Sequence, residues 1–171
     1  ADNSLSAANS GSEKNRSPDT NSDIHPSKNS EHKANRLDQY LELTGQNDLP
    51  QAKLMKGCLE HLQENHVVEA YLRGSFAYED ADPLSDIDLF MVVEPEKLQE
   101  SYEAALEYLS DNYPIIVSCW DNRVKDYGGV GFMFICQNDD GHPVQLDLYF
   151  ALKGVQPKET LIDAPRVLST D

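Results

Sequence analysis

An aspartate interrupts the apolar run PVQLDLYFAL at residues 143–152, and this feature constrains the fold more than any other. The run has the length and composition of a β-strand. Because side chains alternate across a strand, its two faces would carry Val144, Leu146, Leu148 and Phe150 on one side and Gln145, Asp147 and Tyr149 on the other. A carboxylate in such a strand costs free energy unless it is paired or bound to a metal. The run therefore predicts a sheet with one apolar face and one face that holds a site; the alternative is an edge strand with Asp147 in water.

A second group of acids precedes another strand-like run. Five acidic residues fall within the ten positions from Glu79 to Asp88, and the apolar run LFMVV follows. Alternation along a strand over residues 86–93 puts Asp86 and Asp88 on one face, with Cα atoms about 6–7 Å apart. Two carboxylates at this spacing can converge on a hard cation such as Mg²⁺. The alternative is a strand entered through an aspartate turn, with both side chains in water. If this strand lies beside residues 143–152, three carboxylates meet and a divalent cation is favoured.

The remaining pattern predicts a small sheet with helices packed against it. Apolar residues at helical spacing predict helices over residues 50–65 and 95–112. Strands are predicted over residues 67–73, 86–93, 114–120, 131–137 and 143–152, the last two joined by a hairpin at NDDGH. Residues 36–47 are interpreted as a linker. Since strands and helices do not alternate in a βαβ series, the predicted fold class is a small α/β sheet with helices packed on it, and a doubly wound fold is disfavoured.

Composition divides the chain into two regions. Residues 1–35 are rich in Ser and Asn and contain no aromatic residue. Such a segment buries too little apolar surface to offset the entropy of ordering, so we predict a disordered N-terminal extension over residues 1–35 and one folded domain over residues 36–171. No stretch has the apolar length of a signal peptide or a membrane span, so we expect a cytoplasmic protein with no membrane contact. The three cysteines lack metal-ligand spacing and are interpreted as reduced core thiols.

The charge of the chain restricts its partners. The formal net charge is −16 at pH 7. Such a surface repels nucleic-acid phosphates and anionic membranes, so a nucleic acid is not the expected partner. It suits cationic partners, and it requires metal ions if the chain is to hold a nucleotide. The basic residues that are candidate phosphate or base contacts are Arg73, Arg123, Lys125 and Lys153.

A glycine and a serine directly follow the strand predicted over residues 67–73. Glycine lets the backbone approach a ligand closely, and Ser75 can cap a short helix whose free N–H groups favour phosphate oxygens. Alone, this pair is only a common turn. Here Gly74-Ser75 is followed by Ser85-Asp-Ile-Asp-Leu and by a later strand aspartate. The combination resembles the nucleotidyltransferase superfamily typified by DNA polymerase β, in particular the small bacterial and antibiotic-modifying members, over roughly Val67 to Lys153.

The resemblance implies a polymerase β-like fold of the α/β (α+β) class, with a mixed β-sheet and helices packed against it. It also implies a role for each matching residue. The nucleotide would be bound by Gly74, Ser75 and Ser85. Two Mg²⁺ ions would be held by the catalytic triad Asp86, Asp88 and Asp147. The reaction would transfer a nucleoside monophosphate from a nucleoside triphosphate, expected to be ATP, to a hydroxyl group of a small molecule, and pyrophosphate would leave. An aminoglycoside or lincosamide-type antibiotic is the acceptor that the resemblance suggests.

Two departures from the family pattern keep other functions open. Small members often read Gly-Ser-x-Ala-x-Gly, and Glu79 stands where the second glycine is expected. Relatives also commonly carry a helical domain after the third aspartate, where few residues follow Asp147. The alternatives are a minimal nucleotidyltransferase that modifies a protein partner, as in toxin–antitoxin pairs, and an inactive nucleotide-binding module. A homodimer is also open.

Overall fold

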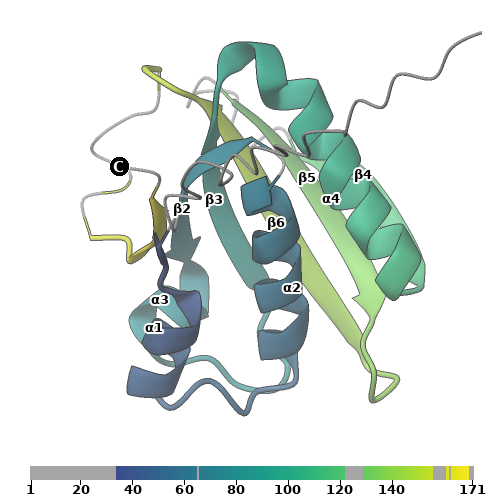
Figure 1. The fold of residues 1–171 in the computed structure, drawn as a ribbon. Coiled ribbons are helices and arrows are strands. Elements are labelled where there is room, and N and C mark those ends of the chain that lie inside the picture. The colour runs from purple at the N-terminus through teal and green to yellow at the C-terminus, as the bar shows by residue number, and fades with distance from the viewer. Residues whose placement is uncertain (1–33, 65, 122–128, 156–160, 162, 170–171) are drawn as a thin grey trace, which may run out of the picture. The chain divides into compact units, whose positions relative to one another are not determined.

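One mixed sheet organises the described part of the chain, and its long helices lie on one face of that sheet (Figure 1). The computed structural model describes residues 34–64, 66–121, 129–155, 161 and 163–169. The chain divides into two units, residues 1–30 and residues 31–171, and only the second has described residues. Disorder was predicted over residues 1–35, of which residues 1–33 lie outside the described residues. For residues 34–35 the prediction is wrong, because they form a short strand, Ala34–Asn35, that pairs with Leu168 and Ser169.

The described strands are β1 (Ala34–Asn35), β2 (Val67–Arg73), β3 (Ile87–Val93), β4 (Ile115–Asp121), β5 (Gly129–Gln137), β6 (Pro143–Leu152) and β7 (Arg166–Ser169). The described helices are α1 (Leu37–Leu43), α2 (Gln51–Glu64), α3 (Gly74–Tyr78), the short 3₁₀ helix η1 (Pro95–Lys97) and α4 (Leu98–Asn112).

The strand order across the sheet is β1-β7-β2-β3-β6-β5-β4. All described pairs are antiparallel except β3–β6, which is parallel. Parallel neighbours need a long crossover, and here α4, β4 and β5 provide it between the end of β3 and the start of β6. The crossover brings together two strands that are far apart in the sequence, and both of them carry aspartates.

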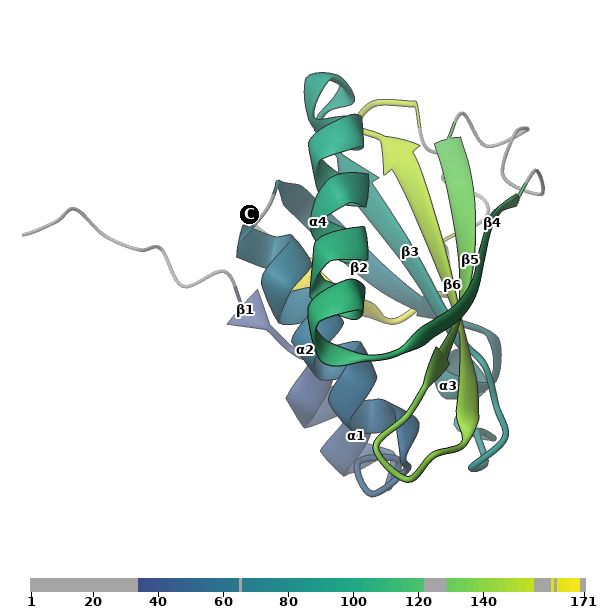
Figure 2. The same ribbon diagram turned by 90° about the vertical axis from the view of Figure 1, so that its right-hand side faces the viewer.

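The face of the sheet covered by α2 and α4 (Figure 2), called the helix face below, is apolar. The β3 side chains on this face are fully buried: Ile87, Leu89, Met91 and Val93. They belong to one apolar cluster with Leu59 of α2 and Leu109 of α4. Burying a side chain of this size stabilises the fold by about 1.5–3 kcal/mol. The helix face therefore supplies most of the core.

The opposite face, called the acidic face below, has a much smaller apolar cluster. Alternation along β3 and β6 turns Asp88 and Asp147 to this side. Its buried apolar members are Phe90, Val92 and Ala151, and its partly buried members are Val68, Tyr71, Tyr149 and Leu161. Most of the apolar burial is thus concentrated on the other side of the sheet.

The predicted fold class is confirmed: a mixed sheet with helices packed against it. Strands β2 and β6 have the predicted bounds, and β3, β4 and α2 each begin one residue later than predicted. The linker predicted over residues 36–47 is wrong, because α1 occupies Leu37–Leu43 and buries Leu37 and Leu41. The thiol prediction is wrong in one respect, since Cys58 and Cys136 are buried and Cys119 is exposed.

Across the described residues, no helix combines the length and the apolarity that crossing a membrane requires.

Candidate active site

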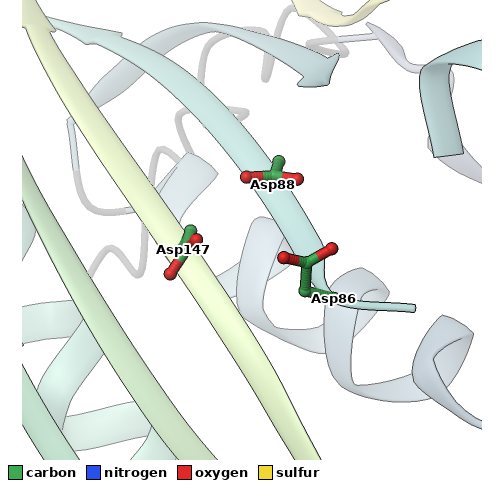
Figure 3. Close-up of side chains that lie close together, drawn as sticks. All are labelled: Asp86, Asp88 and Asp147. Carbon is green, nitrogen blue, oxygen red and sulfur yellow. The ribbon is translucent and has the colours of Figure 1, made fainter. Parts of the chain in front are cut away.

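Three carboxylates meet on the acidic face. Asp88 of β3 pairs directly with Asp147 of β6 in the parallel register, and Asp86 lies just before β3. Figure 3 shows the three side chains on these two neighbouring segments. One carboxylate oxygen from each residue lies within 4.8 Å of the others. Asp147 is buried, Asp88 is half-buried and Asp86 is the most exposed of the three. The two neighbouring strands therefore gather the three aspartates as the sequence predicted.

The Asp147 carboxylate is oriented by residues of its own strand. The Gln145 side-chain amide donates a hydrogen bond to Asp147 Oδ2 at 3.1 Å, and the Tyr149 hydroxyl lies 3.5 Å from the same oxygen. All three residues share one face of β6 because they stand two positions apart. Asp147 is only 1% exposed. A buried carboxylate needs such donors, and here they also fix its direction toward β3.

Gly74 lies against Asp88 at the end of β2. Its φ of +59° is in the left-handed region, which glycine adopts without strain. A Cβ atom at this position would lie only 2.3 Å from Asp88 Oδ2. Gly74 therefore serves two purposes: it permits the bend into α3 and it leaves room for the Asp88 carboxylate.

The bend after Gly74 is held from α1 and from the turn that follows α1. The Tyr40 hydroxyl donates hydrogen bonds to the carbonyl oxygens of Phe76 (2.9 Å) and Ala77 (3.2 Å). Gln46 Nε2 also donates to the Phe76 carbonyl, at 3.1 Å. Burial, and secondly the charge of Glu79, raises the pKa of Tyr40, which keeps this hydroxyl protonated as a donor. These supporting residues were missed because the segment had been interpreted as a linker.

Ser75 and Ser85 have different surroundings. Among the described residues, the buried Ser75 hydroxyl oxygen has no hydrogen-bond partner. The Ser85 hydroxyl accepts a hydrogen bond from the Asp82 backbone N–H (2.9 Å) and lies 3.2 Å from Asp82 Oδ1. Ser85 is thus committed to the turn before β3. The prediction that Ser75 caps the short helix is wrong, because Ser75 lies inside α3 and its buried hydroxyl caps no backbone group. A nucleotide-binding role for either remains a prediction.

The acidic loop before β3 is anchored from α2. Gln51 is fully buried, and its Nε2 donates to the carbonyl oxygens of Asp82 (2.9 Å) and Ser85 (2.8 Å). A single side-chain amide thus holds two points of the turn that leads into Asp86. The sequence gives no periodic signal for this role, because Gln51 is a polar residue at the start of a helix.

Glu79 ends α3 in the left-handed conformation, with φ of +61° and ψ of +25°. Its backbone N–H donates to the Ser75 carbonyl, as in a common helix C-terminal motif. Glycine is favoured at such a position, which accounts in backbone terms for the second glycine of the family pattern. The chain keeps the left-handed turn with a residue that adopts it less readily.

A cavity of about 300 Å³ adjoins the bend at Gly74. Its lining includes Arg73, Tyr78 and Asp163, which offer a cation, an aromatic ring and a carboxylate. Arg73 stands directly opposite Asp88 in the β2–β3 pair. Lys153 forms an ion pair with Glu94 at 2.8 Å, away from the triad. The two other basic candidates lie outside the described residues: Arg123 and Lys125.

The donor set fits a magnesium ion. Mg²⁺ prefers oxygen ligands in octahedral geometry at about 2.0–2.1 Å, so two oxygens bound to one ion lie roughly 3–4 Å apart. The triad oxygens lie within 4.8 Å of one another, so small side-chain rotations would bring them to this spacing. Three carboxylates this close repel one another, and a divalent cation offsets that repulsion.

A family model described as "Nucleotidyltransferase domain" matches residues 53–129. The matched segment includes Gly74, Ser75, Asp86 and Asp88, and it ends before Asp147. Asp147 lies outside the matched segment, and the pairing of β3 with β6 places it beside Asp88. A search of curated proteins finds no match. The match and the fold together show that the chain contains a nucleotidyltransferase domain, which supports a transferase enzyme, and the mixed sheet is consistent with the polymerase β-like fold.

Proposed function

We propose that this chain transfers a nucleoside monophosphate from a nucleoside triphosphate to a hydroxyl group of a small molecule, in a magnesium-dependent reaction that releases pyrophosphate. The observation that carries the proposal is the meeting of Asp86, Asp88 and Asp147 within 4.8 Å on one face of the sheet. A nucleotidyltransferase domain uses a nucleoside triphosphate and a divalent metal in general. ATP as the donor and two Mg²⁺ ions are the specific form that we propose.

Each site residue has a role in this proposal. Asp86 and Asp88 hold the metal from β3, and Asp147 completes the ligand set from β6. Mg²⁺, when bound there, neutralises phosphate charge and aligns the attacking and leaving oxygens. Asp147 also accepts the proton of the acceptor hydroxyl through the carboxylate that Gln145 orients.

The nucleotide is positioned by the bend after β2. Gly74 lets the phosphates approach the backbone beside Asp88, and the Ser75 hydroxyl donates to a phosphate oxygen. We assign Ser85 a supporting role, since its hydroxyl is engaged with Asp82 and so holds the entry to Asp86. Arg73, which lines the adjoining cavity, balances part of the negative charge of the phosphates.

The acceptor that best suits the site is a small hydroxyl-bearing molecule with positive charge. The net charge of −16 disfavours nucleic acids, which carry phosphates, and favours cations. The 300 Å³ cavity lies at the lower end of the volumes that small-molecule sites occupy, about 300–1,000 Å³. Aminoglycosides, which carry both amines and hydroxyls, are the first acceptors to test, followed by lincosamides.

The test is a pyrophosphate-release assay with each of the four common nucleoside triphosphates against a panel of hydroxyl compounds, with and without Mg²⁺. We expect release that requires Mg²⁺, an acceptor and Asp147. Asp147→Asn should abolish it. Asp80→Asn is the matched control, because Asp80 is an exposed acid in the same loop outside the triad.

Two results would contradict the proposal. Equal release by wild type and Asp147→Asn would remove the triad from the chemistry. Transfer of labelled nucleotide onto protein in a lysate, without any small-molecule product, would replace the proposed acceptor by a protein partner.

A further inference from the structure

The two edges of the sheet are built differently. One edge is β1, which has only two residues, and short edge strands resist pairing with other chains. The other edge is β4, which has seven residues and pairs only with β5 among the described strands (Figure 2). A register shift occurs near its start, between Ile115 and Val117, and the pairing is regular from there to Asp121. A row of backbone N–H and C=O groups on β4 therefore faces outward along a regular strand.

The first five residues of the edge strand, Ile115 to Cys119, are uncharged. Ile116 is 59% exposed and Val117 is 41% exposed, and they are the two adjacent members of the exposed large apolar residues in the described part of the chain. Edge strands that stay unpaired usually carry charges or proline; in β4 these lie only at the ends, with Pro114 directly before the strand and Asp121 as its last residue. Its composition is that of a strand that pairs.

We propose that β4 pairs antiparallel with β4 of a second copy of this chain, so that two sheets join into one about a twofold axis. An antiparallel edge is complementary to itself under a twofold rotation, so an identical strand supplies a matching row of hydrogen bonds. The uncharged segment keeps like charges out of the contact, although the two chains repel each other elsewhere. The contact covers Ile116 and Val117 in both copies.

The chain's own N-terminal segment is a poor alternative occupant of this edge. Residues 1–33 contain no aromatic residue and no valine, and their only large aliphatic residues are Leu5 and Ile24. A strand needs β-branched or aromatic residues along its length, so this segment lacks the composition of a partner strand.

The proposed contact leaves the acidic face open. β4 is separated from β6 by β5, which places it about 10 Å from the Asp147 strand at the usual strand spacing. Dimer formation therefore does not require the triad, and the proposal stands independently of the proposed function.

The test is sedimentation velocity of the full chain over a range of concentrations, at low and high salt. We expect the mass to rise from one chain to two with concentration. Since each copy carries a net charge of −16, added salt should strengthen the association by screening the repulsion. Hydrogen exchange over residues 115–121 should slow as the dimer forms, because the outward N–H groups become bonded.

Val117→Lys is the test variant and Leu43→Lys is its matched control. Leu43 is an exposed apolar residue on α1, 79% exposed, so the control adds the same charge away from the edge. Val117→Lys should raise the dimer dissociation constant more than about tenfold, because two like charges would meet across the contact. Leu43→Lys should dimerise at least as well as wild type.

Three outcomes would overturn the proposal. The first is a wild-type chain that stays monomeric at every concentration and salt level. The second is a folded Val117→Lys variant that dimerises as wild type does. The third is an association that added salt weakens, which would indicate a contact between opposite charges rather than this neutral edge.

Discussion

The two faces of the central sheet are built from the same strands but differ in composition and in role. On the helix face, β3 presents fully buried aliphatic side chains to α2 and α4. On the acidic face, the same strand presents Asp88 beside Asp147, next to a small apolar cluster. Neighbouring residues of β3 therefore differ in purpose: one side provides stability and the other provides chemistry.

The largest effects should come from the neighbours Leu89 and Asp88. Leu89→Ala removes a fully buried side chain from the helix face and should lower the free energy of unfolding by about 2–5 kcal/mol. Asp88→Asn should leave stability near that of wild type, because it removes one of three mutually repelling charges. It should lower the transfer rate by more than about 100-fold, since even losses in the surroundings of a metal ligand cost about 10–100-fold. Urea denaturation and pyrophosphate release measure the two quantities. A loss of stability in Asp88→Asn as large as in Leu89→Ala would contradict the division of roles.

Alkaline pH should weaken the helix face through its buried thiols. Burial raises the pKa of Cys58 from 9.0 to about 12 and that of Cys136 to about 11. Above pH 9.0 the unfolded chain releases these protons while the folded chain keeps them. The free energy of unfolding should therefore fall as pH rises from 9.0 to about 11, by about 1.4 kcal/mol per pH unit for each thiol. Denaturation at a series of pH values measures the slope, and Cys58→Ala should reduce it. A slope unchanged in that variant would show that Cys58 does not contribute.

The next prediction compares two glycines that both have positive φ. Gly74 and Gly45 have φ of +59° and +71°, so alanine at either position should cost about 1–2 kcal/mol of backbone strain. Only at Gly74 would the added Cβ contact Asp88; at Gly45 no atom lies within 4 Å. Gly74→Ala should therefore also lower activity about 100-fold, the cost of misplacing a catalytic group by about 1 Å. Equal activities in the two variants would remove Gly74 from the positioning of Asp88.

The smallest expected effect is a gain in stability at Glu79. Glu79 adopts a left-handed conformation at the end of α3, which glycine adopts without strain. Glu79→Gly should raise the free energy of unfolding by about 0.5–1 kcal/mol, the release of strain exceeding the added entropy of the unfolded chain. Thermal denaturation gives the sign. A destabilised variant would show that Glu79 makes a compensating contact.

The strands were predictable from the sequence because their signal is local. Val67–Arg73 and Pro143–Leu152 are bounded apolar runs, and their alternation correctly assigned Asp147 to the face opposite Leu146. Helix α1 was missed because its stripe is short: Leu37, Tyr40 and Leu41 occupy barely one turn. Its burial depends on packing against the rest of the domain, which a short periodic pattern cannot reveal.

From the sequence, the three aspartates could be predicted to meet only if the two strands that carry them lie side by side. Asp88 and Asp147 lie on strands separated by a helix and two further strands, so their register depends on the whole crossover. The contact between Gly74 and Asp88 and the anchoring of the acidic loop by Gln51 are likewise long-range features. Local patterns name the residues of the site, whereas their distances follow from the packing of the whole sheet.

The most direct test of the central claim is metal binding by the triad itself. Titration of the full chain with Mn²⁺, followed by electron paramagnetic resonance with a non-hydrolysable nucleotide present, reports binding without requiring turnover. We predict saturable binding that is lost in Asp147→Asn and retained in Asp80→Asn. Binding that is equal in wild type and Asp147→Asn would contradict the claim that the two strands of the acidic face gather their carboxylates around a metal ion.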